Sequence, residues 1–389
     1  MQLLFSFHTC PMEEPGTGLS GGMNVFLRGL LPGIAARGFP TDVLTRGKGT
    51  EVELTRPFPG VRILHLPCGW RDPPSRESAY EALPQFARCA RELLAGERTP
   101  YDVVSVHYWM SGVACLEAGL RPQAVTFHTV EARKASPADS SMRLSAIRRE
   151  AEERLSREGS RIICFSEGDL ARTMEIFPAA EGKGTVIPPG VDDLFRNPPP
   201  RGEARRRHRI PAGAFLFLLA ARPDPGKNVV SAIEAFRALR SEEGDRLRLL
   251  VAGQELPPDL LSAGVSCTGP VPYAEMPYLY SAADAVLCPS TYESFGLVPL
   301  EGMAAGRPVI AASGGFWGDT IVSEGGGVAY SPELPTGLAE AMRTIYVEES
   351  LRARLSEEGV RIAARFTWEK CTESWGRLLS RIARPGSRR

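Results

Sequence analysis

Short apolar runs alternate with amphipathic stretches along most of the chain. In the first half, this pattern predicts strands near residues 3–8, 41–44, 61–66, 103–106, 124–127, 161–165 and 185–187, and helices near 23–36, 79–95, 143–157 and 167–176. In the second half, it predicts strands near 215–220, 247–252, 285–288 and 309–312, and a helix over about 227–240. Strands that alternate with helices indicate parallel sheets built from βαβ units.

A proline-dense segment, Pro188 to Pro200, separates the two halves and has the composition of a linker. We therefore expect α/β domains over residues 1–190 and 191–366, each doubly wound, that face each other across a cleft. In such sheets ligands bind at the carboxyl ends of the strands. The basic run Arg201–Arg209 follows the linker, and we interpret it as a solvated helix.

Composition narrows the class of protein. The 389 residues include 46 basic and 46 acidic side chains, so no net charge would recruit nucleic acid or an anionic membrane. No apolar run is long enough to span a bilayer, and the N-terminus lacks the basic region of a signal peptide. The eight cysteines are scattered without a CxxC pair. We expect a cytoplasmic enzyme without a zinc site.

Two glutamates lie eight positions apart in the second half, Glu293 and Glu301. A chain this rich in glutamate gives about three such pairs by chance, so the spacing alone decides little. Between them a predicted strand ends, Gly296 permits a tight turn, and a helix is predicted over residues 299–305. A helix start offers free backbone N–H groups to an anion. We expect Glu301 in the first helical turn to accept hydrogen bonds from a ribose diol, and Glu293 to face a sugar.

Two cations lie five positions apart after the first strand of the second half, Arg222 and Lys227. The loop between them contains proline and glycine, so both side chains can reach one phosphate group at the end of that strand. The twelve aspartates include no Asp-x-Asp pair, which is one means of holding a divalent ion on a diphosphate. We therefore expect no metal, and we expect Arg222 and Lys227 to stabilise the diphosphate charge.

A glycine pair, Gly21 and Gly22, precedes the first predicted helix and allows the backbone to approach a phosphate closely. This pair, Arg222 with Lys227, and Glu293 with Glu301 together resemble the family 4 retaining glycosyltransferases of the GT-B fold. The resemblance covers nearly the whole chain. It is greatest to the subgroup that contains inositol-phosphate N-acetylglucosaminyltransferases and sucrose-phosphate synthases, through segments 20–25, 107–112, 126–129 and 147–153.

The resemblance implies roles for individual residues. Of two Rossmann-like domains, residues 1–190 would bind the acceptor and residues 191–366 would bind the nucleotide sugar. A last helix over 367–385 would pack back on the first domain. His128, Glu293, Arg222 and Lys227 would be catalytic. The donor would be bound by Gly22, Arg222, Lys227, Ser294, Phe295, Gly296, Leu297 and Glu301, and the acceptor by Asn24, Tyr108, Thr129 and Arg149.

The chain departs from the family pattern in two places. After Ser313-Gly-Gly315 the family usually continues Leu-Pro-Glu-Ile, whereas this chain has Phe-Trp-Gly-Asp-Thr-Ile. Members that use inositol phosphate carry an acceptor-binding lysine in the region that corresponds to residues 71–83, and this chain has no lysine there. The first departure leaves donor contacts open, and the second leaves the acceptor open.

The expected activity is transfer of a sugar from a nucleotide-diphosphate sugar, UDP-linked, to a small hydroxylated acceptor with or without a phosphate. No other cofactor is expected, no nucleic acid and no stable membrane insertion, and a homodimer is compatible with the sequence. Two alternatives stay open. One is a peripheral membrane glycosyltransferase with a GDP-mannose or UDP-sugar donor and a lipid-linked acceptor, and the other is a nucleotide-sugar-binding protein without catalysis.

Overall fold

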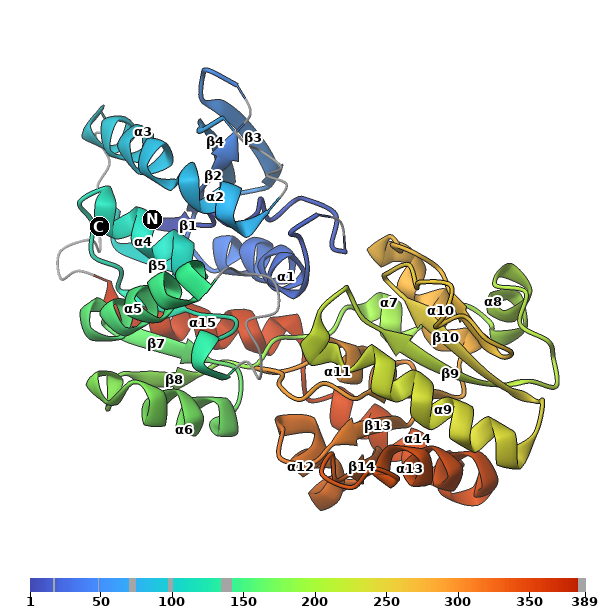
Figure 1. Ribbon diagram of the computed structural model, residues 1–389. Helices are drawn as coiled ribbons and strands as arrows, with labels where there is room; N and C mark the ends of the chain where they lie inside the picture. The colour runs from blue at the N-terminus through green and yellow to red at the C-terminus, as the bar shows by residue number, and fades with distance from the viewer. Residues whose placement is uncertain (17, 48, 70–74, 97–100, 134–141, 384–389) are drawn as a thin grey trace. The chain divides into compact units, whose positions relative to one another are not determined.

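The computed structural model describes residues 1–16, 18–47, 49–69, 75–96, 101–133 and 142–383 (Figure 1). These residues form two compact units. Unit 1 comprises Met1–Gly190 together with the C-terminal segment from Trp368, and unit 2 comprises Val191–Thr367. Each unit has its own sheet and its own core. The predicted fold class, two Rossmann-like α/β domains, is confirmed.

The sheet of unit 1 has eight strands in the order β3-β4-β2-β1-β5-β6-β7-β8. Every pair is parallel except β3 with β4, which form an antiparallel edge. The strands are β1 (Gln2–Phe5), β2 (Thr41–Gly47), β3 (Glu53–Phe58), β4 (Val61–Pro67), β5 (Val103–His107), β6 (Ala124–Thr126), β7 (Arg161–Cys164) and β8 (Gly184–Val186).

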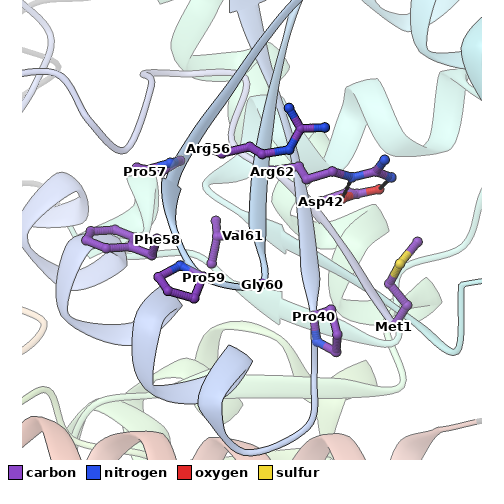
Figure 2. Close-up of a pocket in the computed structure, with 10 residues that line it drawn as sticks. All are labelled: Met1, Pro40, Asp42, Arg56, Pro57, Phe58, Pro59, Gly60, Val61 and Arg62. Carbon is purple, nitrogen blue, oxygen red and sulfur yellow. Dashed lines mark hydrogen bonds and ion pairs between the residues drawn. The ribbon is translucent and has the colours of Figure 1, made fainter.

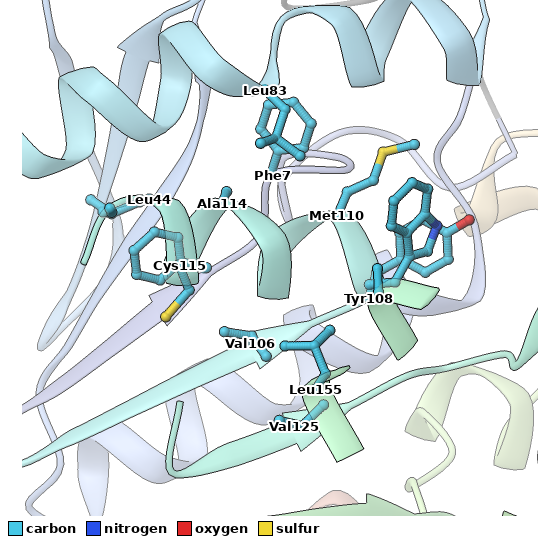
Figure 3. Close-up of a cluster of buried hydrophobic side chains, with 14 of the residues drawn as sticks. Phe7, Leu44, Leu83, Val106, Tyr108, Met110, Ala114, Cys115, Val125 and Leu155 are labelled. Atoms are coloured by element: carbon cyan, nitrogen blue, oxygen red, sulfur yellow. The ribbon is translucent and has the colours of Figure 1, made fainter. Parts of the chain in front are cut away.

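Helices cover both faces of this sheet. The helices of unit 1 are α1 (Gly22–Ala36), α2 (Arg76–Glu81), α3 (Leu83–Gly96), α4 (Trp109–Glu117), α5 (Met142–Glu158), α6 (Glu167–Ile176) and α15 (Trp368–Ile382), with single turns η1 (Glu131–Arg133) and η2 (Pro178–Ala180). One core joins α3, α4 and α5 to Val106 of β5, and Figure 3 shows Val106, Val125 and Leu155 packed together within it. The next residue along β5, His107, points to the other face, where it contacts α1 and α15.

Helix α15 packs closely on α1 within unit 1. A Cβ atom on Gly29 would lie 2.2 Å from the ring of Trp368, and one on Gly33 would lie 2.4 Å from Thr372. Glycine at these two positions of α1 therefore lets the two helices approach. The ring of Trp375 stacks on His107 at 5.5 Å, so the C-terminal helix also covers the end of a central strand of unit 1.

The sheet of unit 2 has six strands in the order β11-β10-β9-β12-β13-β14, and all of them are parallel. They are β9 (Phe215–Ala220), β10 (Leu247–Ala252), β11 (Val265–Cys267), β12 (Ala285–Cys288), β13 (Val309–Ala312) and β14 (Gly327–Tyr330). Their apolar runs are nearly continuous, because helices bury the sheet on both faces.

The helices of unit 2 are α7 (Asp193–Arg196), α8 (Arg201–Arg207), α9 (Val229–Glu243), α10 (Met276–Ala282), α11 (Leu297–Ala304), α12 (Phe316–Glu324), α13 (Gly337–Val347) and α14 (Glu349–Ala363), with single turns η3 (Pro225–Lys227) and η4 (Tyr273–Glu275). Helix α8 forms in the basic run as predicted, but it is not fully solvated. Arg205 is 8% exposed and donates to Asp284 at 2.7 Å, which ties α8 to the strand region of unit 2. Within the described ranges, no helix has both the length and the apolar character needed to cross a membrane.

Candidate active site

The strand order of unit 2 reverses direction between β9 and β12. The chain runs from β9 outward through β10 to β11, and then returns to place β12 on the other side of β9. Loops that leave adjacent strands at such a point diverge and leave an opening at the carboxyl ends of the strands, where ligands bind in α/β folds. The loop after β9 carries Arg222 and Lys227, and the loop after β12 carries Glu293.

Hydrogen bonds hold these two loops of unit 2 together. The carboxylate of Asp224 accepts from the backbone N–H of Gly226 at 2.9 Å, which closes the turn before Lys227. Asn228 takes a left-handed conformation, with φ of 50°, and its amide donates to the carbonyl of Pro289 at 2.9 Å. The backbone geometry therefore fixes the place from which the Lys227 side chain extends.

The ammonium of Lys227 forms an ion pair with Oε1 of Glu293. Each side chain is 31% exposed, so the pair lies at the surface of unit 2 and a ligand can reach it. Arg222 is exposed two residues beyond the end of β9. The structure thus brings together the lysine and the first glutamate that the sequence selected, at the strand ends where ligand is expected.

Helix α11 begins at Leu297, two residues before the predicted start at 299. Gly296 precedes it with φ of 87°, a conformation that favours glycine, and its carbonyl accepts from the indole Nε1 of Trp317 at 2.8 Å. Because the helix starts earlier, Glu301 lies in the second turn and not in the first, so the predicted position of Glu301 was wrong. The backbone N–H groups of the first turn still lie beside the loop of Glu293.

The carboxyl group of Glu301 is buried, with the residue 5% exposed. Tyr280 donates to Oε2 at 2.7 Å, and Tyr273 donates to Oε1 at 3.4 Å. Burial raises the pKa of Glu301 to about 8, against the two tyrosine hydrogen bonds, which lower it. A carboxyl oxygen can accept a second hydrogen bond, so the predicted ribose contact stays a prediction, but two tyrosines already hold the group in place.

The raised pKa of Glu301 predicts a pH dependence of stability. A carboxyl group whose pKa is higher in the folded state stabilises the fold fully below its unfolded value of 4.5, and this contribution is lost as the pH rises towards about 8. We expect the melting temperature of the wild type to fall across this window relative to Glu301→Gln, which keeps the size and cannot ionise. The slope corresponds to about 1.4 kcal/mol of unfolding free energy per pH unit. The melting temperatures of both proteins can be measured by circular dichroism between pH 5 and about 8. The prediction is wrong if the two melting temperatures change with pH in parallel.

The side chain of Phe295 is buried within unit 2. It is 3% exposed and packs in an aromatic cluster of unit 2 that consists of Phe295, Phe316, Trp317 and Phe366. Phe316 stacks on Phe295 at 5.0 Å. The unusual Phe-Trp after Gly315 is therefore accounted for by packing beneath the α11 loop. Of the predicted donor-binding residues, Phe295 can contribute only its backbone, and Ser294 is also buried, at 8% exposure.

Unit 1 has its own reversal of strand order, between β1 and β5. The loop after β1 leads to Gly21 and to Gly22, which is exposed at the start of α1. The loop after β5 begins with Tyr108, whose ring lies 4.3 Å from that of His8. Gly22 and Tyr108 therefore follow the two strands between which ligand is expected in unit 1.

Asn24 does not face an open acceptor pocket. The residue is fully buried, and its amide nitrogen donates to Thr9 Oγ1 at 3.0 Å and to the carbonyl of Cys10 at 2.6 Å. Its side-chain oxygen accepts from the backbone N–H of Gly21 at 3.0 Å. The prediction that Asn24 lines the acceptor site is corrected, because its hydrogen bonds shape the loop that presents Gly22.

Two residues at strand ends of unit 1 have a positive φ, Tyr108 at 74° and His128 at 62°. This conformation is uncommon for residues with a side chain, and such strain gathers at functional sites. His128 Nε2 lies 3.0 Å from Nδ1 of His107, and its ring packs on Phe26 and Phe165. Desolvation by burial lowers the pKa of His128 to about 3, so its imidazole is neutral at pH 7. Its contact with the donor sugar stays a prediction.

Arg148, and not the predicted Arg149, lies beside Tyr108 and Thr129. Its guanidinium donates to the hydroxyl of Tyr108 at 3.2 Å, and to the carbonyl and Oγ1 of Thr129 at 2.6 and 3.0 Å. Arg149 lies on the exposed face of α5, one residue further around the helix. All four acceptor-side expectations therefore change or gain a partner. Asn24 is buried in hydrogen bonds of its own loop, Arg149 is exposed, and Tyr108 and Thr129 are joined by Arg148.

Residues 71–83, the region in which this chain has no lysine, lie partly outside the described residues. A separate pocket of about 500 Å³ opens in unit 1 beside Met1, Arg56, Arg62 and Asp42 (Figure 2). It lies at the amino ends of the strands, opposite to the end where Tyr108 and Gly22 lie. Arg62 binds Asp42 there, with Nε 2.7 Å from Oδ1, so we assign no role to this pocket in the reaction.

Comparison with known proteins finds a glycosyltransferase family model along each half of the chain. Residues 20–193 match the family described as "Glycosyltransferase Family 4", and residues 200–361 match "Glycosyl transferases group 1". A D-inositol 3-phosphate glycosyltransferase from Actinosynnema mirum is 32% identical over 95% of this chain and 94% of its own length. The protein of the same description from Corynebacterium glutamicum is 30% identical over 94% of this chain and 93% of its own length.

Solved structures with the same fold agree. A sucrose-phosphate synthase from Thermosynechococcus elongatus superimposes with a TM-score of 0.83 at 24% identity, over 98% of both chains. The Anabaena protein HepE, solved with UDP and glucose, gives a TM-score of 0.73 at 19% identity, over 98% of this chain and all of its own. The predicted resemblance is confirmed. The chain belongs to glycosyltransferase family 4, and it is a glycosyltransferase of the GT-B fold.

Proposed function

We propose that this enzyme transfers a sugar from a UDP-sugar to a small hydroxylated acceptor, with retention of configuration at the anomeric carbon. The observation that carries this proposal is the Lys227–Glu293 ion pair at the strand ends of unit 2, with Arg222 exposed at the same edge. A cation there suits a diphosphate, and a carboxylate suits the hydroxyl groups of a sugar. A structural neighbour that contains UDP and glucose supports the choice of donor.

The reaction is a direct group transfer. The bond between the anomeric carbon and the β-phosphate oxygen breaks, and the acceptor oxygen bonds to that carbon on the same face. The acceptor's proton passes to an oxygen of the departing diphosphate, so no protein nucleophile is needed. Negative charge grows on the diphosphate as it leaves, and Arg222 and Lys227 stabilise it. Glu293, released from Lys227, would then accept hydrogen bonds from the sugar.

The acceptor would bind in unit 1, at the carboxyl ends of β5 and β6. Tyr108 follows β5 directly, and His128 and Thr129 follow β6 after one residue. Hydroxyl groups both donate and accept hydrogen bonds, so Tyr108 and Thr129 can pair with hydroxyl groups of an acceptor. The relatives named D-inositol 3-phosphate glycosyltransferase support a small hydroxylated acceptor of this kind.

Thermal stabilisation by nucleotides tests the donor side of the proposal. A ligand that binds only the folded state raises the melting temperature, so we expect UDP to raise it more than GDP or ADP at equal concentration. A hundredfold excess of UDP over its Kd should add about 2.7 kcal/mol of unfolding free energy. Equal or no stabilisation by the three nucleotides would contradict a uridine-linked donor.

Slow hydrolysis of the donor separates an enzyme from a protein that only binds nucleotide sugars. We expect purified protein to release UDP from a UDP-sugar when water replaces the acceptor, at a rate above the uncatalysed one. The released UDP can be measured by a coupled assay, and the anomeric configuration of the transferred sugar by NMR. Inversion at the anomeric carbon would exclude the same-face mechanism.

A further inference from the structure

Arg148 is buried in unit 1 together with two carboxylates. Arg148 is 3% exposed, Glu131 is 6% exposed and Glu152 is fully buried. Nε of Arg148 donates to Oε1 of Glu152 at 2.6 Å, and Nη1 forms an ion pair with Oε2 of Glu131 at 3.1 Å. One guanidinium is therefore matched by two carboxylates at the place where an acceptor would meet the enzyme.

All three nitrogen atoms of the Arg148 guanidinium have partners inside the protein. A guanidinium has five N–H groups. Nε donates to Glu152, Nη1 to the hydroxyl of Tyr108, and Nη2 to both the carbonyl and Oγ1 of Thr129. The fifth N–H belongs to Nη1, the nitrogen in ion-pair contact with Glu131. A phosphate could bind Arg148 only by displacing one of these partners.

Glu131 is held firmly in its place. Its Oε1 accepts from the hydroxyl of Ser145 at 2.6 Å, and its backbone N–H donates to Oε2 of Glu152 at 3.0 Å. Burial raises the pKa of Glu152 above its usual value, and the nearby charge of Glu131 adds to that rise. A phosphate with its two negative charges would enter next to these carboxylates in a region of low dielectric, where like charges repel strongly.

We propose that Glu131 is a specificity-determining residue that keeps Arg148 away from ligands and restricts the acceptor to uncharged hydroxylated compounds. The inference rests on the proposed function, because it concerns the acceptor of that transfer. Glu131 acts through Arg148 and is a positioning residue. The hydroxyl groups of Tyr108 and Thr129 lie on the same guanidinium and suit the hydroxyl groups of a polyol or sugar.

Binding of inorganic phosphate tests the proposal without knowledge of the acceptor. The protein is first saturated with UDP, so that the diphosphate site is filled, and phosphate is then titrated by calorimetry. We expect Glu131→Ala to bind phosphate at least about tenfold more tightly than the wild type, since a like-charge contact is removed and Arg148 is released. Adding Arg148→Gln to Glu131→Ala should return the affinity to the wild-type level. Equal phosphate affinity in wild type and Glu131→Ala would overturn the proposal.

Two further variants control for folding. Glu131→Gln removes the charge but keeps the size, and it decides the question if Glu131→Ala does not fold. Glu153→Gln removes a carboxylate from the exposed face of α5, where it pairs with Arg157, and should leave phosphate affinity unchanged. Each variant must retain the wild-type shift in melting temperature with UDP before its phosphate affinity is compared. A gain in Glu153→Gln equal to that in Glu131→Ala would also overturn the proposal.

Transfer to matched acceptors gives a second, independent test. Inositol is compared with inositol 3-phosphate, and glucose with glucose 6-phosphate. We expect the wild type to have a kcat/KM at least about 100-fold higher for the unphosphorylated member of the pair that it uses, and Glu131→Ala to shift this ratio about tenfold towards the phosphate. If UDP stabilises the protein and donor hydrolysis occurs, a wild-type preference for the phosphorylated member would overturn the inference about Glu131 but not the proposed function. Absence of both UDP binding and hydrolysis would instead overturn the proposed function.

Discussion

Replacement of Lys227 by alanine is expected to lower kcat for sugar transfer by about 10²- to 10³-fold, the usual loss when one group that stabilises an oxyanion is removed. Lys227 extends from a turn fixed by Asp224 and Asn228, and its ammonium pairs with Glu293 at the strand ends. We expect UDP still to raise the melting temperature of the variant, because Arg222 and the start of α11 remain. The effect would then fall mainly on kcat and less on KM.

Lys370→Ala provides the control, since it removes a lysine from the exposed part of α15 in unit 1. A double-mutant cycle with Glu293→Gln measures how strongly Lys227 and Glu293 depend on each other. Each of the two residues binds a different part of the donor in the proposed reaction, so the double variant should be less active than either single one. Full activity of Lys227→Ala together with full activity of Glu293→Gln would exclude the proposed donor site.

The strands that position the site could be predicted from the sequence, but not every element around them. β5, β9, β12 and β13 are short apolar runs that end near proline, glycine or polar residues, and their bounds agree with prediction to within a residue. Helix α4 was missed, because it is buried and apolar on most of its surface and so lacks an amphipathic period. Strand β3 was also missed, since it is an exposed edge strand that contains Pro57.

Local chemistry was easier to predict than the partners of individual side chains. Lys227 and Glu293 each lie in a loop directly after a strand, so sequence position alone placed them at one edge of the sheet. The hydrogen bonds of Asn24 to Thr9 and Cys10, and those of Glu301 to Tyr280, join residues that are 14 to 21 positions apart. Which polar side chain turns inward to meet such a partner depends on packing that no local pattern records.

The choice between Arg148 and Arg149 shows a signal that the sequence did contain. Leu144, Arg148, Ala151 and Leu155 recur at helical spacing and form the buried face of α5. Phasing α5 on its apolar residues places Arg148 inside and Arg149 outside. Because the two arginines are adjacent, a resemblance between motifs cannot tell which of them faces inward. The helical period of the apolar residues can.

Gly318→Ala is expected to destabilise unit 2 strongly. Gly318 is the third residue of α12, and a Cβ atom there would lie 2.1 Å from the carbonyl oxygen of Ala312, at the end of β13. The nearest atoms all belong to backbone, so no side chain can move aside and the start of α12 must shift away from the sheet. We expect a loss of about 3 kcal/mol in the unfolding free energy of unit 2, the upper part of the range for overpacking.

Gly168→Ala is the matched control, because Gly168 is also near the start of a helix and a Cβ atom there would have no neighbour within 4 Å. Alanine favours a helix over glycine by about 1 kcal/mol, so this variant should be as stable as the wild type or more so. Urea denaturation followed by circular dichroism compares the three proteins. Because α12 packs through Trp317 on the carbonyl of Gly296, a shift of α12 should also weaken stabilisation by UDP. If Gly318→Ala were as stable as the wild type, the start of α12 could move without cost and the prediction would be wrong.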